Sequence, residues 1–520
     1  MSGLPSPSVF RGLEKLIANP AYQADNDSRE TEEITEKFTG KVIGHVPRST
    51  KEDTLAAIER ARVAQKEWAK RSLKDRAAVL RRFAKITMAE RENTADILQA
   101  ETGKSRASAL EEVLDTNVNA RYYANHGPGL LKPKRVRGML PVLTKTVILR
   151  KPKGVVGIVT PWNYPYTLAA SDALPALLAG NAVVLNPASL TPYSAMRAAE
   201  LLYQAGVPRD IFQVVTGRGS QVGDTIAHNA DYLMFTGSSA TGHKLGEIAG
   251  GRLISYSAEL GGKNAMIVEK GANLKKAASV SMRGMFANAG QLCISIERVY
   301  VERDVMDEFL QHLKNRLDKL VIAANYEYST EFGSIISEKQ VQKIDGHVKD
   351  AVAKGAKVFY GGKRLPEIGP LYYSPTVLLD VPEGAEVREN ETFGPVVSVY
   401  PVDSVEEAIE RANDTEYGLN SSVWGKTYKS GELIASQLET GTVAVEEGYV
   451  SAWESLHAPM GGQGISGISH RHGPEGILKY TDTTTVGVQR LVDTDGNGIL
   501  PHRIWQKYFM PIITRFFVQA

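Results

Sequence analysis

Cysteine is almost absent from this 520-residue sequence, because Cys293 is the only one. A chain with one cysteine forms no internal disulfide and no zinc site built from cysteines, so we expect a protein of the reducing cytoplasm. An excess of one charge is also missing, because 61 Lys and Arg stand against 59 Asp and Glu. This balance gives no reason to expect nucleic acid or an anionic membrane as the main partner.

Long apolar runs and targeting patterns are missing as well. The most apolar region, 154–185, contains Asn163, Asp172 and three prolines. We therefore expect buried strands and helices there, not a membrane span. The first residues, MSGLPSPSVF, do not have the basic and then apolar pattern of a secretion signal.

No metal site is expected from the sequence. Residues 493–499, DTDGNGI, look like the start of an EF-hand loop. The twelfth position of that loop would be Ile504 and not a glutamate, and no pair of flanking helices is evident. We interpret the segment as a turn.

The chain is too long for one hydrophobic core, so two or three domains are expected. Helical periodicity dominates the first part, with one helix predicted to start at a capping Thr54 and a second helical region over 76–103. The stretch 144–151, TKTVILRK, alternates polar and β-branched residues. It is predicted to be a strand of an arm that leaves the body of the domain.

Strands and helices alternate from Gly154 onward, which predicts a parallel, doubly wound α/β sheet that binds its ligand beyond the carboxyl ends of the strands. The expected strands of this first sheet lie at 154–160, 181–186, 210–217, 231–237 and 253–262. The alternation resumes after Cys293, so a second α/β domain is expected, with a hinge near Gly261 and Gly262.

Cys293 lies in a short junction, because a helical pattern stops at Gly290 and a strand begins at Ile294. Functional residues are often found in such loops. A lone cysteine can be a nucleophile if its thiolate is supported, or an inert buried side chain. The cysteine count alone favours the inert alternative, and the junction favours the nucleophile.

Three further stretches carry groups that suit a reaction centre. Glu259 ends an apolar strand, where a carboxylate is costly unless it is used in chemistry or paired, with Lys263 as the candidate partner. Asn163 follows a buried strand, and its amide could donate to an oxyanion or simply be a turn residue. FTGSSATG, residues 235–242, is a strand running into Gly and Ser before a helix, which suits a phosphate.

Taken together and in this order, the motifs resemble the aldehyde dehydrogenase superfamily over residues 35–485. The motifs that carry the resemblance are PWNYP, NPASLTP, FTGSSATG, ELGGKN, NAGQLC, ETFGP and PMGGQGISG. The resemblance implies an aldehyde dehydrogenase-like α/β fold with a Rossmann-type cofactor domain, an α/β catalytic domain and a small β-arm for oligomerisation. The implied boundaries are 1–134 and 153–260 for the cofactor domain, 261–456 for the catalytic domain, 135–152 and 473–490 for the arm, and 491–520 for a tail extension.

The resemblance also implies a mechanism. Cys293 attacks the aldehyde carbon, while the Asn163 side chain and the Cys293 backbone N–H hold the oxyanion. The adduct gives up a hydride and becomes a thioester, and Glu259 is the general base for its hydrolysis. The cofactor-binding residues implied by the resemblance are Thr160, Pro161, Trp162, Asn186, Ser189, Gly219, Gly223, Ser238, Leu260, Glu391 and Phe393.

Two departures from the family pattern bear on the cofactor. Asn186 stands where a lysine usually holds the adenosine ribose, and Ser189 stands where NAD-preferring members carry a glutamate. Ser189 removes a repulsion toward a 2′-phosphate, whereas Asn186 weakens the binding of that phosphate. We therefore expect both NADP and NAD to work, with NADP slightly preferred.

Two further departures from the family pattern bear on the substrate. The chain is most similar to succinate-semialdehyde dehydrogenases of the actinobacterial type, yet Ser171 and Ala287 replace the two arginines that hold the substrate carboxylate in better-known members. Arg471, which stands where a glutamate is usual, is the candidate replacement, and its alternative role is an ion pair with a surface acid. The predicted substrate-binding residues are Tyr164, Ser171, Leu292, Ile294, Met460 and Arg471.

Two rival functions remain open at this point. One is a broad-range aldehyde dehydrogenase for apolar or aromatic aldehydes, and the other is a non-catalytic binding or structural protein on the same fold. A homodimer or homotetramer is expected. The aromatic tail after residue 490 is expected to pack on a neighbouring subunit. Membrane contact is disfavoured because Pro511 interrupts an amphipathic helix there.

Overall fold

The structure is a computed structural model that describes residues 9–18, 29–138, 144–490 and 501–517. Near the N-terminus, a short 3-10 helix (Leu13–Leu16) precedes a hairpin of β1 (Thr31–Thr35) and β2 (Val42–Pro47). Four helices follow: α1 (Lys51–Lys70), α2 (Leu73–Ala89), α3 (Arg91–Thr102) and α4 (Arg106–Leu131).

The prediction that α1 starts at a capping Thr54 is wrong by one turn. Thr50 is the N-cap, and it forms a capping box with Asp53, in which each side chain bonds the other residue's backbone N–H. This arrangement satisfies two of the free N–H groups at the helix start, so the helix begins at Lys51.

The first α/β layer is a six-stranded sheet in the order β19-β9-β8-β5-β6-β7. Its strands are parallel except for β19, and the apolar residues of β5, β6 and β8 are buried, as expected for a sheet covered on both faces. The bounds are β5 (Val155–Thr160), β6 (Ala182–Pro187), β7 (Phe212–Val214), β8 (Tyr232–Thr236), β9 (Ser255–Glu259) and β19 (Gly467–Ile468).

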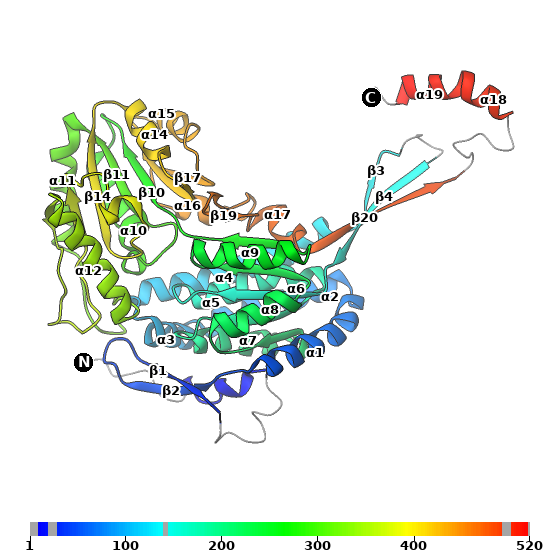
Figure 1. The fold of residues 1–520 in the computed structure, drawn as a ribbon, viewed down its shortest axis with the longest axis horizontal. Coiled ribbons are helices and arrows are strands. Elements are labelled where there is room, and N and C mark those ends of the chain that lie inside the picture. The colour runs from blue at the N-terminus through cyan, green and yellow to red at the C-terminus, as the bar shows by residue number, and fades with distance from the viewer. Residues whose placement is uncertain (1–8, 19–28, 139–143, 491–500, 518–520) are drawn as a thin grey trace.

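Helices connect these strands, which confirms the predicted doubly wound α/β fold (Figure 1). Helix α7 begins with a proline in its first turn and ends at Gly206, whose φ of 102° is in the left-handed region. The helices of this layer are α5 (Pro165–Ser171), α6 (Ala173–Ala179), α7 (Pro192–Ala205), α8 (Asp224–Asn229) and α9 (Ser239–Gly251).

The second α/β layer is a seven-stranded sheet in the order β12-β13-β14-β11-β10-β16-β17, with β12 antiparallel. Its strands are β10 (Asn264–Val268), β11 (Ile296–Glu302), β12 (Lys357–Tyr360), β13 (Thr376–Leu379), β14 (Val396–Val402), β16 (Asn420–Trp424) and β17 (Thr442–Val445). The helices are α10 (Leu274–Phe286), α11 (Arg303–Leu317), α12 (Glu338–Ala353), α13 (Glu386–Glu389), α14 (Val405–Asn413), α15 (Tyr428–Ala435) and α16 (Val450–Trp453).

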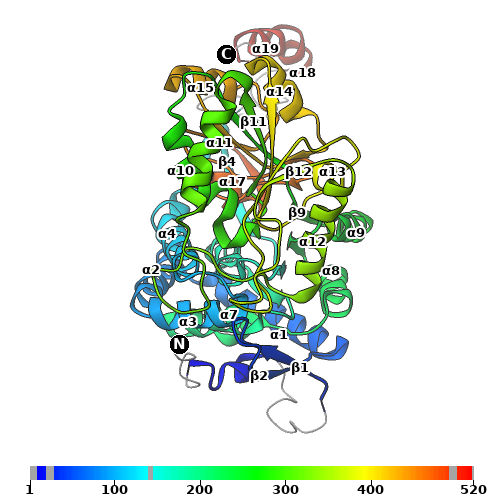
Figure 2. The same cartoon turned by 90° about the vertical axis from the view of Figure 1, so that its left-hand side faces the viewer.

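The chain crosses from the first sheet to the second between Glu259, the end of β9, and Asn264, the start of β10. Each layer has its own hydrophobic core, and the two layers lie one above the other in Figure 2. The chain later returns to pair β19 with β9, and a two-residue pairing of β15 (Tyr417–Gly418) with β18 (Gln463–Gly464) lies beside this return. Glu259 and the loop before β11 therefore meet at the junction of the layers.

A three-stranded arm projects from the body in Figure 1. It consists of β3 (Lys134–Val136), β4 (Thr144–Pro152) and β20 (Thr481–Gln489), with β4 in the middle. The last arm strand starts later than the expected boundary at residue 473, because α17 (Gly473–Leu478) packs against α4 and α6 in the body.

The end of the described chain is helical and lies beyond the arm in Figure 1. It runs through α18 (His502–Ile504), a π-helical segment (Trp505–Phe509) and α19 (Met510–Phe517). The prediction that Pro511 interrupts this helix is wrong, because the helical segment continues from His502 through Pro511 to Phe517, with a π-helical turn directly before Met510. The EF-hand-like stretch 493–499 lies outside the described residues. Among the residues that the structure describes, no helix is long and apolar enough to span a bilayer.

Candidate active site

Cys293 lies on a strained turn between α10 and β11. Three residues just before it have left-handed backbone angles: Asn288 (φ 49°), Ala289 (φ 55°) and Gly290 (φ 71°). A Cβ on residue 290 would lie 2.1 Å from the carbonyl oxygen of Gly394, so only glycine fits this approach. Strained non-glycine residues persist where the surroundings fix them, which is common at reaction centres.

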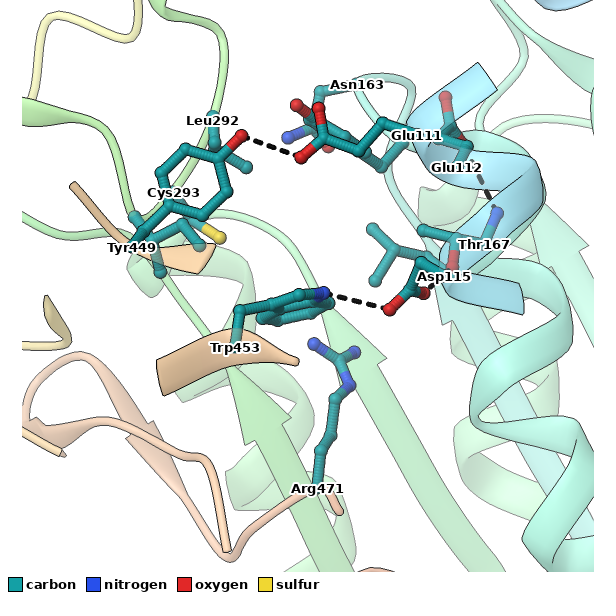
Figure 3. A pocket seen from close by; sticks show the side chains of 13 residues that line it. Glu111, Glu112, Asp115, Asn163, Thr167, Leu292, Cys293, Tyr449, Trp453 and Arg471 are labelled. Atoms are coloured by element: carbon teal, nitrogen blue, oxygen red, sulfur yellow. Dashed lines mark hydrogen bonds between the residues drawn. The ribbon is translucent and has the colours of Figure 1, made fainter. Parts of the chain in front are cut away.

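Two cavities meet at Cys293. The inner cavity is drawn in Figure 3. The outer cleft reaches the N-terminus of α9. Cys293, Asn163 and Leu168 line both spaces, so a molecule in either one can reach the sulfur.

Asn163 is held close to the cysteine loop. The side-chain amide of Asn163 donates to the backbone carbonyl oxygen of Gln291 at 3.1 Å. The backbone carbonyl oxygen of Asn163 accepts from Lys104 Nζ at 2.8 Å. A side-chain amide has two N–H donors, so one remains to stabilise negative charge developing near Cys293. The structure therefore brings together all three predicted catalytic residues, because Asn163, Glu259 and Cys293 all line the outer cleft.

Glu259 lies on the outer-cleft side of Cys293. It is 2% exposed, and neither carboxylate oxygen has a hydrogen-bond partner among the described residues. Burial raises the pKa of Glu259 to about 7, although Arg471 and Lys479 oppose this shift. The alternative that Glu259 pairs with Lys263 is wrong, because Lys263 pairs with Glu297. A buried carboxyl with a pKa near neutrality and no partner suits a general base.

The Cys293 thiol is protonated in this arrangement, because burial raises its pKa to about 12. Arg471 opposes the shift, while Glu391 and Glu259 add to it. The thiol must therefore pass its proton to a base as the sulfur attacks, since the thiolate is the nucleophile.

Arg471 makes an ion pair, but with a buried acid and not the surface acid considered from the sequence. Its Nη2 lies 2.7 Å from Asp172 Oδ2 and also donates to Thr236. Its Nε bonds the same carboxylate at 3.1 Å. Of the three guanidinium nitrogens, only Nη1 has no partner among the described residues, and Arg471 lines the inner cavity below Trp453 in Figure 3.

The outer cleft contains most of the predicted nicotinamide-side residues. Trp162 and Phe393 stand edge to face with ring centroids 5.4 Å apart. Glu391 accepts from the backbone N–H of Gly262 at 2.9 Å, and Ser238 caps α9, whose N-terminus suits a pyrophosphate. The predicted cofactor residues that line this cleft are Pro161, Trp162, Ser238, Leu260, Glu391 and Phe393.

A second group of predicted cofactor residues gathers around the loop after β7. Asn186 donates its side-chain amide to the carbonyls of Val215 and Gly217, and Ser189 donates to Gly217 at 3.2 Å. Asn186 is therefore occupied in holding this loop. Gly219 and Gly223 bound the π-helical turn that follows, and Thr160 ends β5 with its hydroxyl buried. Arg218, which follows Gly217 and is exposed, was missed from the sequence because no motif marks it.

The inner cavity contains only part of the predicted substrate set. Tyr164, Leu292, Ile294 and Arg471 line it, whereas Ser171 lines the adjoining space. Met460 was predicted to line the cavity, but it is not among the lining residues, although it is buried in the same apolar cluster as Tyr164, Leu292 and Ile294. Seven lining residues were missed because they lie outside the family motifs: Glu111, Glu112, Asp115, Thr167, Leu168, Tyr449 and Trp453.

Comparisons with known proteins agree with this geometry. The model of the aldehyde dehydrogenase family matches residues 23–486. A Mycobacterium ulcerans protein named "Putative succinate-semialdehyde dehydrogenase", with NADP(+) as cofactor, is 54% identical over 510 residues, which cover 98% of each chain. The NADP(+) succinate-semialdehyde dehydrogenase of Escherichia coli is 34% identical and covers 92% of this chain and 98% of its own.

A solved structure shows the same fold. The crystal structure of succinate-semialdehyde dehydrogenase from Burkholderia pseudomallei matches with a TM-score of 0.85 and 33% identity, over 89% of this chain and 95% of that one. The protein belongs to the aldehyde dehydrogenase family. The family resemblance inferred from the motifs is therefore confirmed.

Proposed function

We propose that this chain oxidises aldehydes to carboxylic acids through a thioester on Cys293, with succinate semialdehyde as the substrate and NADP or NAD as the hydride acceptor. The observation that carries the proposal is the position of Cys293 where the two cavities meet, with the unpartnered Glu259 on the cleft side. One cavity can hold the aldehyde while the other holds the nicotinamide.

The residues of the chain divide the reaction between them. Cys293 loses its proton to solvent and attacks the aldehyde carbon, and the Asn163 amide with the Cys293 backbone N–H stabilises the oxyanion. A nicotinamide cofactor, when bound in the outer cleft, supplies the acceptor for the hydride that leaves this carbon. Glu259 then takes a proton from water, which hydrolyses the thioester and releases the acid.

The residues of the outer cleft fit a dinucleotide. Ser238 and the N-terminus of α9 would hold the pyrophosphate, Glu391 the nicotinamide ribose, and Trp162 and Phe393 the ring. Ser189 places no negative charge near a 2′-phosphate, and Arg218 stands directly beside the carbonyl that Ser189 bonds. The relatives at 52–54% identity carry NADP(+) in their names, whereas a betaine aldehyde dehydrogenase of Staphylococcus aureus was solved with NAD+. We propose that NADP is preferred and NAD accepted.

Succinate semialdehyde is proposed because relatives over nearly the whole chain carry that name. Its carboxylate needs a cation in the inner cavity, and the Nη1 of Arg471 is the donor that remains. A broad-range activity on apolar or aromatic aldehydes is the second candidate. The observation that favours it is the lining of the inner cavity by Tyr164, Leu168, Leu292, Ile294, Tyr449 and Trp453.

We also propose that the chain acts as a homodimer or homotetramer in the cytoplasm. The arm exposes Val486 and Val488, and the terminal helix exposes Ile504, Tyr508, Phe509 and Ile512. A second copy of the chain could cover these side chains. The single cysteine is compatible with a reducing compartment.

The experiment that tests the activity is cofactor reduction by the purified full chain with NADP or NAD and an aldehyde panel. The panel contains succinate semialdehyde, butanal and benzaldehyde. The proposal predicts the highest kcat/KM for succinate semialdehyde with NADP. A preference for benzaldehyde or butanal would replace the substrate assignment with the broad-range activity.

A further inference from the structure

The inner cavity contains one carboxylate that no cation balances. Of the other two carboxylates that line it, Glu112 pairs with Lys104 and Glu111 with Arg283. Asp115 is buried, with 6% of its surface exposed, and it lines the same cavity in Figure 3. Among the described residues, it takes part in no ion pair. Buried charges in proteins are normally paired, so Asp115 is the exception in this wall.

Neutral donors keep Asp115 in place as an anion. Trp453 Nε1 donates to it at 2.9 Å and the Asn119 amide at 3.1 Å, while Thr167 donates its hydroxyl. Ser171 makes the longest contact, at 3.4 Å, and also bonds Thr167. None of these donors carries charge, so the cavity keeps a negative charge on this side. The Ser171 contact is the one that a stronger donor would displace.

A second group in the cavity also lacks a partner. The hydroxyl of Tyr164 is buried and has no hydrogen-bond partner among the described residues, although Tyr164 is 8% exposed and lines the cavity. A phenolic oxygen can accept a bond from an ammonium group. Aromatic faces attract cations, and of the rings that line this space Tyr164 already has Lys104 over it and Tyr449 has Arg283, so the Trp453 ring is the one to face an added cation.

The charge near Asp115 is opposite to that expected for a site specific to anions. Ser171, which contacts Asp115, stands at one of the two positions where better-known succinate-semialdehyde dehydrogenases carry an arginine. Ala287 stands at the other. The wall near Ser171 therefore presents a carboxylate in place of a guanidinium.

We infer that the inner cavity also accepts aldehydes that carry a protonated amine, with Asp115 as the counter-ion of the ammonium group and the Tyr164 hydroxyl as an acceptor. The aldehyde reacts at Cys293 as any other would: water supplies the oxygen, the hydride leaves to NADP or NAD, and one proton is released. The inference rests on the proposed aldehyde oxidation, and it adds a substrate class beyond succinate semialdehyde.

The test compares 3-aminopropanal with butanal, because these aldehydes have the same length and differ at the end by an ammonium in place of a methyl group. Asp115→Asn keeps the shape of the side chain and removes the charge. Loss of a hydrogen bond to a charged group predicts that kcat/KM for 3-aminopropanal falls about 10- to 100-fold. The kcat/KM for butanal should change by less than about threefold by the same reasoning.

Asp307→Asn is the matched control. Asp307 is exposed on α11, so this substitution makes the same Asp-to-Asn change away from the cavity. It should alter neither substrate. An equal loss on both aldehydes with Asp115→Asn would show a structural role for Asp115 and overturn the inference. An unchanged kcat/KM for 3-aminopropanal would overturn it as well.

Ser171→Arg provides a second test if Asp115→Asn fails to fold. The new guanidinium would neutralise Asp115, so it should depress 3-aminopropanal oxidation and improve succinate semialdehyde oxidation, each measured relative to butanal. The opposite change in either substrate overturns the inference. Failure of the proposed function itself is distinguishable, because a wild-type chain that oxidises neither butanal nor succinate semialdehyde lacks aldehyde dehydrogenase activity altogether.

Discussion

Arg471 and Asp172 form a buried ion pair, with 2.7 Å between Nη2 and Oδ2 and only 5% and 3% of their side chains exposed. Arg471 lines the inner cavity, and it opposes the upward pKa shifts of both Glu259 and Cys293. The same guanidinium therefore holds Asp172 and acts electrostatically on the two groups proposed for catalysis. Its Nη1 remains for a substrate.

The first prediction concerns this arginine. Arg471→Ala leaves Asp172 buried without a cation, which costs about 3–5 kcal/mol of stability, so it tests folding more than binding. The double variant Arg471→Gln with Asp172→Asn removes both charges. It should lower kcat/KM for succinate semialdehyde about 10- to 100-fold, because one charged hydrogen bond is lost.

Butanal is the internal control for the double variant, because it has no carboxylate. Steady-state kinetics on both aldehydes, with thermal unfolding measured beside them, separates binding from stability. If both aldehydes lose the same factor, Arg471 is not the carboxylate anchor.

The second prediction separates the two stages of the reaction. Glu259→Gln keeps the size of the side chain but cannot accept a proton, so thioester hydrolysis should become very slow. Stopped-flow measurement should show a burst of reduced cofactor followed by slow turnover. Loss of the burst, with cofactor binding intact, would assign Glu259 an essential part in activating Cys293, and not mainly in hydrolysis.

The third prediction is a pH dependence. The pKa of Glu259 is raised to about 7 by burial, and a general base works only when deprotonated. Turnover limited by thioester hydrolysis should therefore be low below pH 7, rise through about 7 and level off above it. The slow turnover of Glu259→Gln should lack this rise. If the turnover of Glu259→Gln rises with pH at the same midpoint as that of the wild type, the titrating group is not Glu259.

The fourth prediction tests the adenosine side. Ser189 bonds the Gly217 carbonyl beside Arg218. Ser189→Glu places a negative charge there, which should weaken NADP far more than NAD because only NADP carries the 2′-phosphate. Ser189→Gln is the uncharged control of the same length. Equal weakening of both cofactors by Ser189→Glu would remove Ser189 from the ribose edge.

Motifs with backbone constraints made much of this account predictable from the sequence. The strand ending at Glu259 and the turn before Cys293 are short-range features, because glycine at 290 and buried strands leave few alternatives. Their positions on facing walls of one cleft followed from the family resemblance, since spacing alone does not place residues 259 and 293 together.

Other features could not be predicted because they depend on long-range contacts. Asp115 on α4 and Trp453 on α16 are 338 residues apart, yet they share a hydrogen bond in the inner cavity. The partner of Arg471 is 299 residues away on the loop between α5 and α6. No local pattern marks either pair. The start of α1 was misplaced for a different reason, because Thr50 and Thr54 both suit an N-cap by residue type.

The most direct test of the central claim is intact-mass analysis of Glu259→Gln after one turnover with butanal and cofactor. A thioester on Cys293 predicts a mass increase of one acyl group, located on the peptide that contains Cys293, together with one equivalent of reduced cofactor. Cys293→Ala in the same background should show neither change while still binding the cofactor. Reduced cofactor without an acyl adduct on Cys293, or turnover by the Cys293→Ala variant, would contradict the account.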